Sequence, residues 1–172
     1  MFQLTHPAPE QVRQWMSTLL DSNYNYEEYS LFHSPAVSGY RHDFVQTEVG
    51  RGKQAFEAGI QSFRQWKMFP STMAEVITLE DKIAVGTVVA VVAKGGGIWS
   101  YNACRIFEVI EEETEDEFRY GFTYATLPGH IARGRSDFCC DSIRVRKKSL
   151  TRSKFIPRPI TGWSDSTRFT FA

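Results

Sequence analysis

The second half of the chain most constrains its fold, because four strand-like segments follow one another there with short connections. Each segment is rich in valine, isoleucine or aromatic residues, which favour β-strands. The segments lie at residues 73–80, 83–93, 98–111 and 117–127. Turn-forming or acidic stretches separate them at Asp81, at Gly95–Gly97 and at residues 111–117. Because consecutive strands with short connections pair antiparallel, the sequence predicts an antiparallel meander, with a further strand at 137–146.

Two amphipathic helices are predicted before this meander. The apolar residues that recur at helical spacing in the first are Val12, Trp15, Met16, Leu19 and Leu20, and in the second Phe56, Ile60, Phe63 and Trp66. Pro9 occupies a position that a first helical turn tolerates. A strand-like stretch at residues 40–49 lies between them. Helices followed by a meander predict an α+β fold, in which a curved antiparallel sheet packs against helices. Glycine-containing strands allow the sheet to bend.

Composition indicates one domain without a general attraction for polyanions. The chain has 172 residues, of which 42% are hydrophobic, and its 20 Lys and Arg balance its 20 Asp and Glu. A neutral total argues against steering to nucleic acid or to an anionic membrane. The aromatic share of 14% suggests a core or cavity lined with rings.

Cysteine and histidine usage excludes several site types. Three cysteines, two of them adjacent, argue against a disulfide framework, and the four histidines lie far apart without zinc-ligand spacing. We therefore expect no metal site. The stretch Val49–Lys53 lacks phosphate-loop spacing, and we expect no cofactor. No leader-like segment or membrane-length apolar run is present, so we expect a cytoplasmic protein without a membrane span.

A histidine directly follows a strand and a turn in the stretch GFTYATLPGHIARG, residues 121–134. Pro128 and Gly129 suit the centre of a tight turn, which places His130 immediately after it. An imidazole is suited to proton transfer near neutrality. The residues close enough in sequence to form a polar cluster with His130 are Tyr124, Thr126 and Arg133. The alternative is that His130 bonds the backbone and pins the turn; without a recognisable partner, turn-pinning or ligand-gripping outweighs catalysis.

The same stretch resembles the hallmark of an uncharacterised family catalogued as domain of unknown function nineteen-ninety. The stretches GYRHDF, VGRGKQAFEAG and WKMF are similar to earlier blocks of that family, and the resemblance spans about residues 23–138. It implies a helix-grip, START-like fold, in which a curved sheet wraps a long C-terminal helix and often encloses an apolar cavity. The family carries no agreed reaction.

The chain departs from this family pattern in two places. Ala125 replaces a usual glycine, and Arg135 with Ser136 replace a usual acidic pair. After Phe138 no long amphipathic pattern follows, and the prolines at 157 and 159 would break a helix, so the gripping helix is not recognisable. We therefore predict a single helix-grip-like domain at 1–148 and an atypical basic tail at 149–172. An uncovered sheet face would favour a homodimer.

These observations favour a protein that binds a small apolar or amphipathic molecule between sheet and helices. The ligand-binding candidates are Tyr124, Thr126, His130, Arg133, Trp66 and Tyr26. The first alternative is an enzyme with His130 as general acid or base. The second is contact between the basic tail and nucleic acid, against which the neutral total charge argues.

Overall fold

The computed structural model describes residues 1–25, 47–50, 52–114, 117–143, 150–153 and 155–156. In these residues the strands and helices are β1 (Phe2–Gln3), α1 (Pro9–Ser17), β2 (Thr47–Gly50), α2 (Gly52–Arg64), β3 (Ala74–Thr78), β4 (Val88–Gly95), β5 (Ile98–Glu113), β6 (Glu117–Thr126), β7 (Arg135–Ile143), β8 (Leu150–Ser153) and β9 (Phe155–Ile156). The predicted α+β class is confirmed, as is the antiparallel sheet packed against helices.

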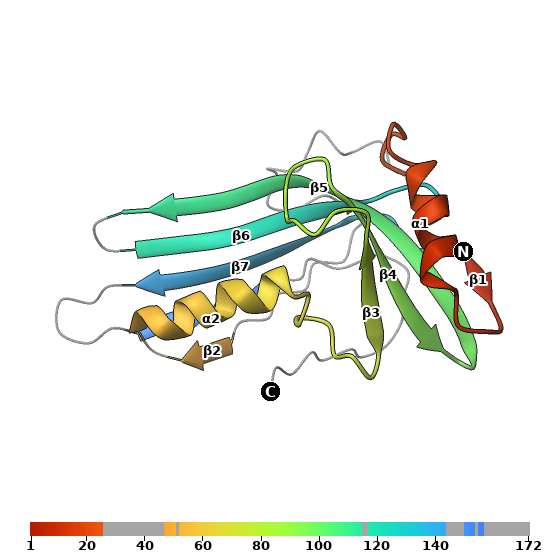
Figure 1. Cartoon of the computed structure of the whole chain (residues 1–172). Helices are drawn as coiled ribbons and strands as arrows, with labels where there is room; N and C mark the ends of the chain where they lie inside the picture. The colour runs from red at the N-terminus through yellow and green to blue at the C-terminus, as the bar shows by residue number, and fades with distance from the viewer. Residues whose placement is uncertain (26–46, 51, 115–116, 144–149, 154, 157–172) are drawn as a thin grey trace.

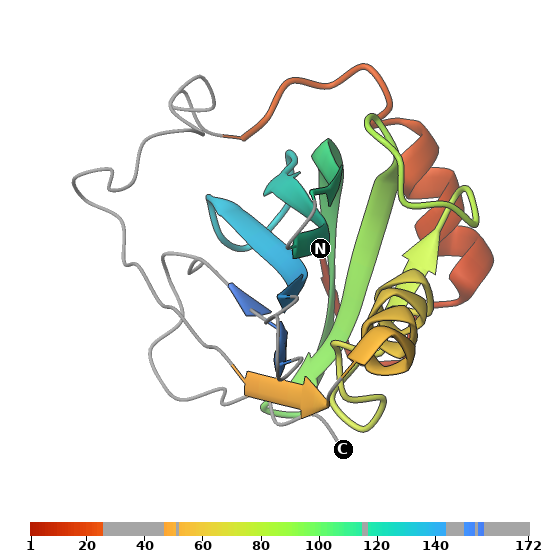
Figure 2. The same ribbon diagram turned by 90° about the vertical axis from the view of Figure 1, so that its left-hand side faces the viewer.

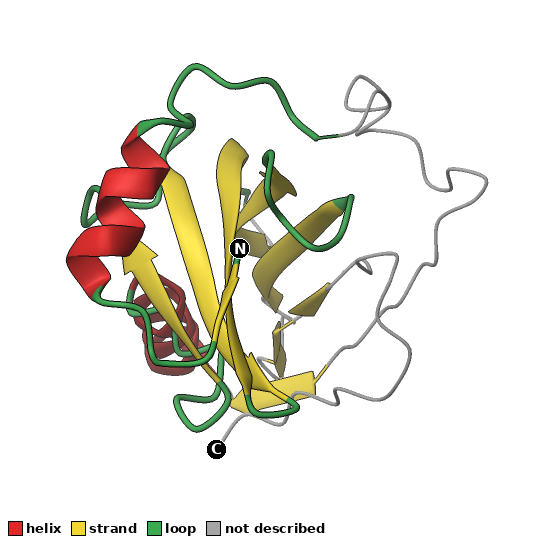
Figure 3. Ribbon diagram, turned by 90° about the vertical axis from the view of Figure 1, so that its right-hand side faces the viewer, coloured by secondary structure: helices red, strands yellow, loops and turns green. Residues whose placement is uncertain are grey.

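The strands of the described residues form one antiparallel sheet in the order β2-β8-β7-β6-β5-β4-β3. Figure 1 shows β5, β6 and β7 side by side within it. In addition, β1 pairs with β5 and β9 pairs with β7. The strands β8 and β9 fall within the stretch that the sequence assigned to a basic tail, and both pair with β7. Figure 3 shows the strands in the middle of the molecule and the two helices at one side.

The long strand β5 organises the sheet, because its two halves pair with different neighbours. Residues 98–105 pair with β4, whereas residues 104–113 pair with β6. The register shifts between Ile106 and Glu108, so Phe107 is an extra residue in β5. Such bulges bend a strand and increase its twist. The curved path of the sheet is visible in Figure 2.

The two helices cover different core clusters, which lie on opposite faces of β4. Alternate residues of a strand point to opposite faces. Accordingly Val88, Ala90 and Val92 belong to the cluster under α1, while Val89 belongs to the cluster under α2. The cluster under α2 is rich in aromatic rings, which Phe63 of the helix contacts.

Predicted boundaries were wrong at the end of α1 and at the start of β4. The helix α1 ends at Ser17, and Leu20 is exposed in the turns that follow rather than packed on the apolar face. The strand predicted at residues 83–93 is β4, which begins at Val88 instead of residue 83, because Gly86 adopts a left-handed backbone with φ of 91°. Residues 84–87 form a turn, in which the Thr87 N–H donates to the Ala84 carbonyl.

Among the described residues, neither helix combines the length and the apolar character that crossing a bilayer requires.

Candidate functional site

The predicted tight turn is present between β6 and β7. The His130 N–H donates to the Leu127 carbonyl at 3.1 Å, and Gly129 has a φ of 83°. A left-handed residue at the third position defines a type II turn, for which proline at the second position is favoured. Pro128 and Gly129 therefore occupy its centre, and His130 directly follows, as the sequence predicted.

The His130 ring contacts the backbone two residues ahead. Its Nδ1 accepts from the Ala132 N–H at 3.0 Å and lies 3.1 Å from the Ala132 carbonyl oxygen. Burial, with a smaller contribution from the nearby Met1 ammonium, lowers the pKa of His130 to about 4, while the Ala132 carbonyl opposes this shift. The ring is therefore neutral near pH 7. These contacts agree with the alternative in which His130 bonds the backbone and holds the turn.

Asn25 ties the start of the chain to the β6–β7 connection. Its Nδ2 donates to the Ala132 carbonyl at 2.9 Å, and its Oδ1 accepts from the Thr126 hydroxyl at 2.6 Å. The Gly134 N–H donates to the same hydroxyl at 3.0 Å. Thr126 and His130 thus belong to one hydrogen-bonded group, in which Ala132 and Asn25 are the intermediates.

Asn102 holds the connection from a second side. Its Oδ1 accepts from the Ile131 N–H at 3.2 Å, and its Nδ2 donates to the Ser100 hydroxyl at 3.2 Å. Sequence analysis missed both asparagines. A polar residue inside the apolar strand SYNACRIF is the available signal for Asn102, because buried amides require hydrogen-bond partners.

Tyr124 lies in a different environment from this polar group. Its ring packs against Phe122 and Phe138 in the cluster under α2, with ring centroids 6.3 and 5.4 Å away. Burial raises the pKa of Tyr124 well above its usual value, although a hydrogen bond to Ser136 opposes this shift. The Tyr124 hydroxyl therefore makes its hydrogen bond to Ser136 within the aromatic cluster.

Trp66, which the sequence predicted within the second helix, lies two residues after the end of α2 in an unusual backbone conformation. The Lys67 N–H donates to the Ser62 carbonyl and the Trp66 N–H to the Phe63 carbonyl, each at 2.9 Å, which is the Schellman pattern. Glycine usually occupies the left-handed position of this motif, but here Trp66 does, with a φ of 56°. A bulky residue in that region is strained.

The indole of Trp66 meets the aromatic cluster at its edge. It lies edge-on to Phe122, with ring centroids 5.4 Å apart, and it stays partly exposed. Phe69, also partly exposed, lies edge-on to Phe138 at 6.0 Å. Together we call the rings of Phe63, Trp66, Phe69, Phe122, Tyr124 and Phe138 the aromatic layer.

Two candidates remain. Arg133 is exposed in the β6–β7 connection, and Tyr26 lies outside the described residues.

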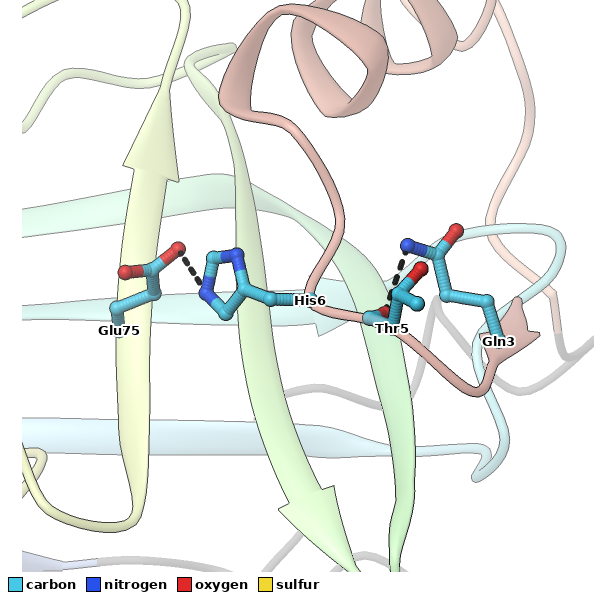
Figure 4. Close-up of polar contacts among 4 residues, drawn as sticks. All are labelled: Gln3, Thr5, His6 and Glu75. Atoms are coloured by element: carbon cyan, nitrogen blue, oxygen red, sulfur yellow. Dashed lines mark hydrogen bonds and ion pairs between the residues drawn. The ribbon is translucent and has the colours of Figure 1, made fainter.

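A second histidine contact ties the segment before α1 to β3, since His6 Nε2 lies 3.3 Å from Glu75 Oε1 (Figure 4). The described residues contain no cluster of three or more histidine, cysteine, aspartate or glutamate side chains able to hold a metal ion.

Arg105 is a further structural residue that sequence analysis missed. Its guanidinium donates to the carbonyls of Leu19, Leu20 and Ser22, at 2.7, 2.6 and 2.8 Å. It also lies over the Tyr24 ring, 5.8 Å from the centroid. A cation at these carbonyls compensates groups left unpaired after a helix end. Arg105 thereby positions the segment that leads to Asn25.

Comparison with known proteins identifies the family. Residues 25–149 match the family model described as Domain of unknown function (DUF1990). A UPF0548 protein of Dictyostelium discoideum is 25% identical over 157 residues, which cover 84% of this chain and 72% of that protein. A UPF0548 protein of Deinococcus radiodurans is 27% identical over 153 residues, covering 80% and 73%. No solved structure shows significant similarity. The chain belongs to the DUF1990 family, as the resemblance in its histidine block predicted.

Proposed function

We propose that the chain binds a small apolar or amphipathic molecule against the aromatic layer between α2 and the sheet. The observation that carries the proposal is the conformation of Trp66, whose indole meets Phe122 from a left-handed backbone position. Backbone strain of this kind persists where the surroundings over-determine a residue, and it is concentrated at ligand clamps and active sites. Glycine at this helix end would adopt the left-handed conformation without the backbone strain, so the strain is not needed to end the helix.

The chemistry of the layer supports an apolar ligand with one polar group. Aromatic rings dominate the cluster under α2. That cluster contains the phenols of Tyr120 and Tyr124; the Tyr124 phenol bonds Ser136 and stays protonated because burial raises its pKa. Ligand sites are typically apolar walls with a few placed polar groups, and Tyr124 with Ser136 would supply such a pair. A helix-grip arrangement around α2 forms part of this proposal.

Native mass spectrometry of the freshly purified protein tests the proposal. The expected spectrum contains the chain with a stoichiometric added mass, which denaturation releases for identification. Trp66→Gly is the informative variant, because it removes the indole and places the preferred residue at the left-handed position. Trp99→Phe is the matched control, since Trp99 packs with the cluster under α1. Equal occupancy in all three proteins would contradict a ligand at the aromatic layer.

Catalysis by His130 is a second candidate, favoured by one observation. Nδ1 is engaged by Ala132, while Nε2 has no hydrogen-bond partner among the described residues and the ring is partly exposed. A neutral ring with a pKa of about 4 is a weak general base at neutral pH. This candidate requires turnover of a small molecule that is lost in His130→Gln.

A further inference from the structure

The β6–β7 connection carries an arrangement in which one histidine nitrogen faces two backbone groups with opposite requirements. His130 Nδ1 is 3.0 Å from the Ala132 nitrogen and 3.1 Å from the Ala132 oxygen. The N–H needs an acceptor, whereas the carbonyl needs a donor. A neutral Nδ1 can accept a hydrogen bond from the Ala132 N–H but cannot donate to the carbonyl. A protonated Nδ1 can donate to the Ala132 carbonyl but cannot accept from the N–H.

Protonation of Nδ1 therefore removes the acceptor of the Ala132 N–H. Ala132 is itself buried, so this amide cannot turn to water while the connection stays closed. The Ala132 carbonyl already accepts from Asn25 Nδ2, so a bond from the protonated Nδ1 would be its second and would not replace the acceptor that the N–H loses. The charged ring would in addition be held in a site that lowers its pKa by desolvation.

The charged groups around the ring do not offset this cost. The Met1 ammonium donates to the Gly129 carbonyl at 3.1 Å and is the positive charge that bears on the ring. The other elements packed here contribute the neutral side chains of Asn102 from β5 and Trp15 from α1. Arg133 follows in the connection and is exposed. No carboxylate among the described residues contacts the imidazole.

We propose that His130 is an acid-sensitive latch: protonation of Nδ1 opens residues 127–134 and releases the hydrogen bond from Asn25 Nδ2 to the Ala132 carbonyl. In the open connection the imidazolium, which is only partly exposed in the closed one, is fully hydrated, and so is the Ala132 N–H. Asn25 keeps its two hydrogen bonds to Thr126 of β6, so acid frees the β6–β7 connection from Asn25 while the segment after α1 stays attached to the end of β6. This inference does not depend on the proposed ligand.

Amide hydrogen exchange across residues 127–134, corrected for the intrinsic effect of pH, tests the latch. For an opening that exposes a histidine of ordinary pKa, the opening constant rises about tenfold for each pH unit between pH 6 and 4.5. We expect this rise at Ala132 in the wild type and a flat profile in His130→Gln. A wild-type profile as flat as that of the variant would overturn the proposal.

Two measurements guard against a variant that fails to fold. An NMR titration of the wild-type His130 ring should give a midpoint below that of an unperturbed histidine, and a midpoint near 6.5 would overturn the latch. Asn25→Ala should raise exchange of the Ala132 amide at neutral pH while keeping the same pH slope. Unchanged exchange in Asn25→Ala would show that the connection is held by other contacts and would equally overturn it.

Discussion

Gly59 of α2 and Cys140 of β7 set how closely the helix approaches the sheet. A Cβ added at Gly59 would lie 2.8 Å from the Cys140 Sγ, which is closer than these atoms can approach without a shift. The aromatic layer is built on this approach, because Phe63 lies one helical turn beyond Gly59 and contacts Phe122 and Phe138. The glycine in the stretch AFEAG is therefore a packing residue.

Substitution at this contact should show compensation. Gly59→Ala is expected to lower the free energy of unfolding by about 1–3 kcal/mol through overpacking, despite the better helix propensity of alanine. Cys140→Ala removes the opposing sulfur, so the double variant should lose less than the sum of the single variants. Chemical denaturation of the four proteins measures this coupling. Strictly additive losses would mean that the helix simply moves away.

Removal of the Arg105 guanidinium should destabilise the end of α1. Arg105→Leu leaves three carbonyls without their charged donor, and we expect a loss of about 2–3 kcal/mol. Arg105→Lys keeps the charge but lacks the planar fork, so it should recover only part of that loss. Thermal unfolding monitored by circular dichroism compares the variants. Full recovery by lysine would indicate that charge alone stabilises this segment.

Gly129→Ala should destabilise the histidine turn. The position has a φ of 83°, and a Cβ there would lie 3.1 Å from Trp15 Cζ2. The left-handed backbone costs an alanine about 1–2 kcal/mol, to which the contact with the indole adds. Gly129→Asn is the matched control, because asparagine tolerates the left-handed region better while meeting the same indole. Equal losses in the two variants would assign the effect to Trp15.

The free energy of unfolding should depend on pH through His130. Burial lowers the pKa of folded His130 to about 4, below the unfolded value of 6.5. The unfolded state thus binds more protons between these values, so stability falls as the pH drops from about 6.5 to 4. The upper limit of the loss is about 3 kcal/mol, and opening of the connection reduces it. Urea titrations at several pH values should show that the free energy of unfolding falls more in the wild type than in His130→Gln within this window. The same pH dependence in both proteins would contradict this prediction.

The fold could be predicted from local patterns wherever the chain's periodicity was strong. The spacing of Val12 and Met16 located α1, and both are fully buried. Periodicity does not encode termination, however, which explains the wrong assignments of Leu20 and of residues 83–87. There the left-handed Gly86 and the hydrogen bond from its N–H to the Ile106 carbonyl decide where the strand begins.

The candidate site was predictable only in part, because its partners come from distant parts of the chain. The turn chemistry of Pro128 and Gly129 is local and was predicted correctly. Asn25 contacts Ala132 across 107 residues, and nothing near either residue in the sequence signals that pairing. The nearness of Tyr124 to His130 in the sequence suggested one cluster, but the Tyr124 ring lies in the aromatic layer.

The measurement that most directly tests the central claim is a fluorescence titration with 1-anilinonaphthalene-8-sulfonate, an apolar ring system with one charged group. The proteins are the wild type, Trp66→Ala and Trp99→Phe, each verified as folded by circular dichroism. If the aromatic layer binds such molecules, Trp66→Ala should weaken affinity about tenfold, the equivalent of about 1.4 kcal/mol, while Trp99→Phe retains it. Equal affinities of all three proteins, or a loss confined to Trp99→Phe, would contradict a ligand at the aromatic layer.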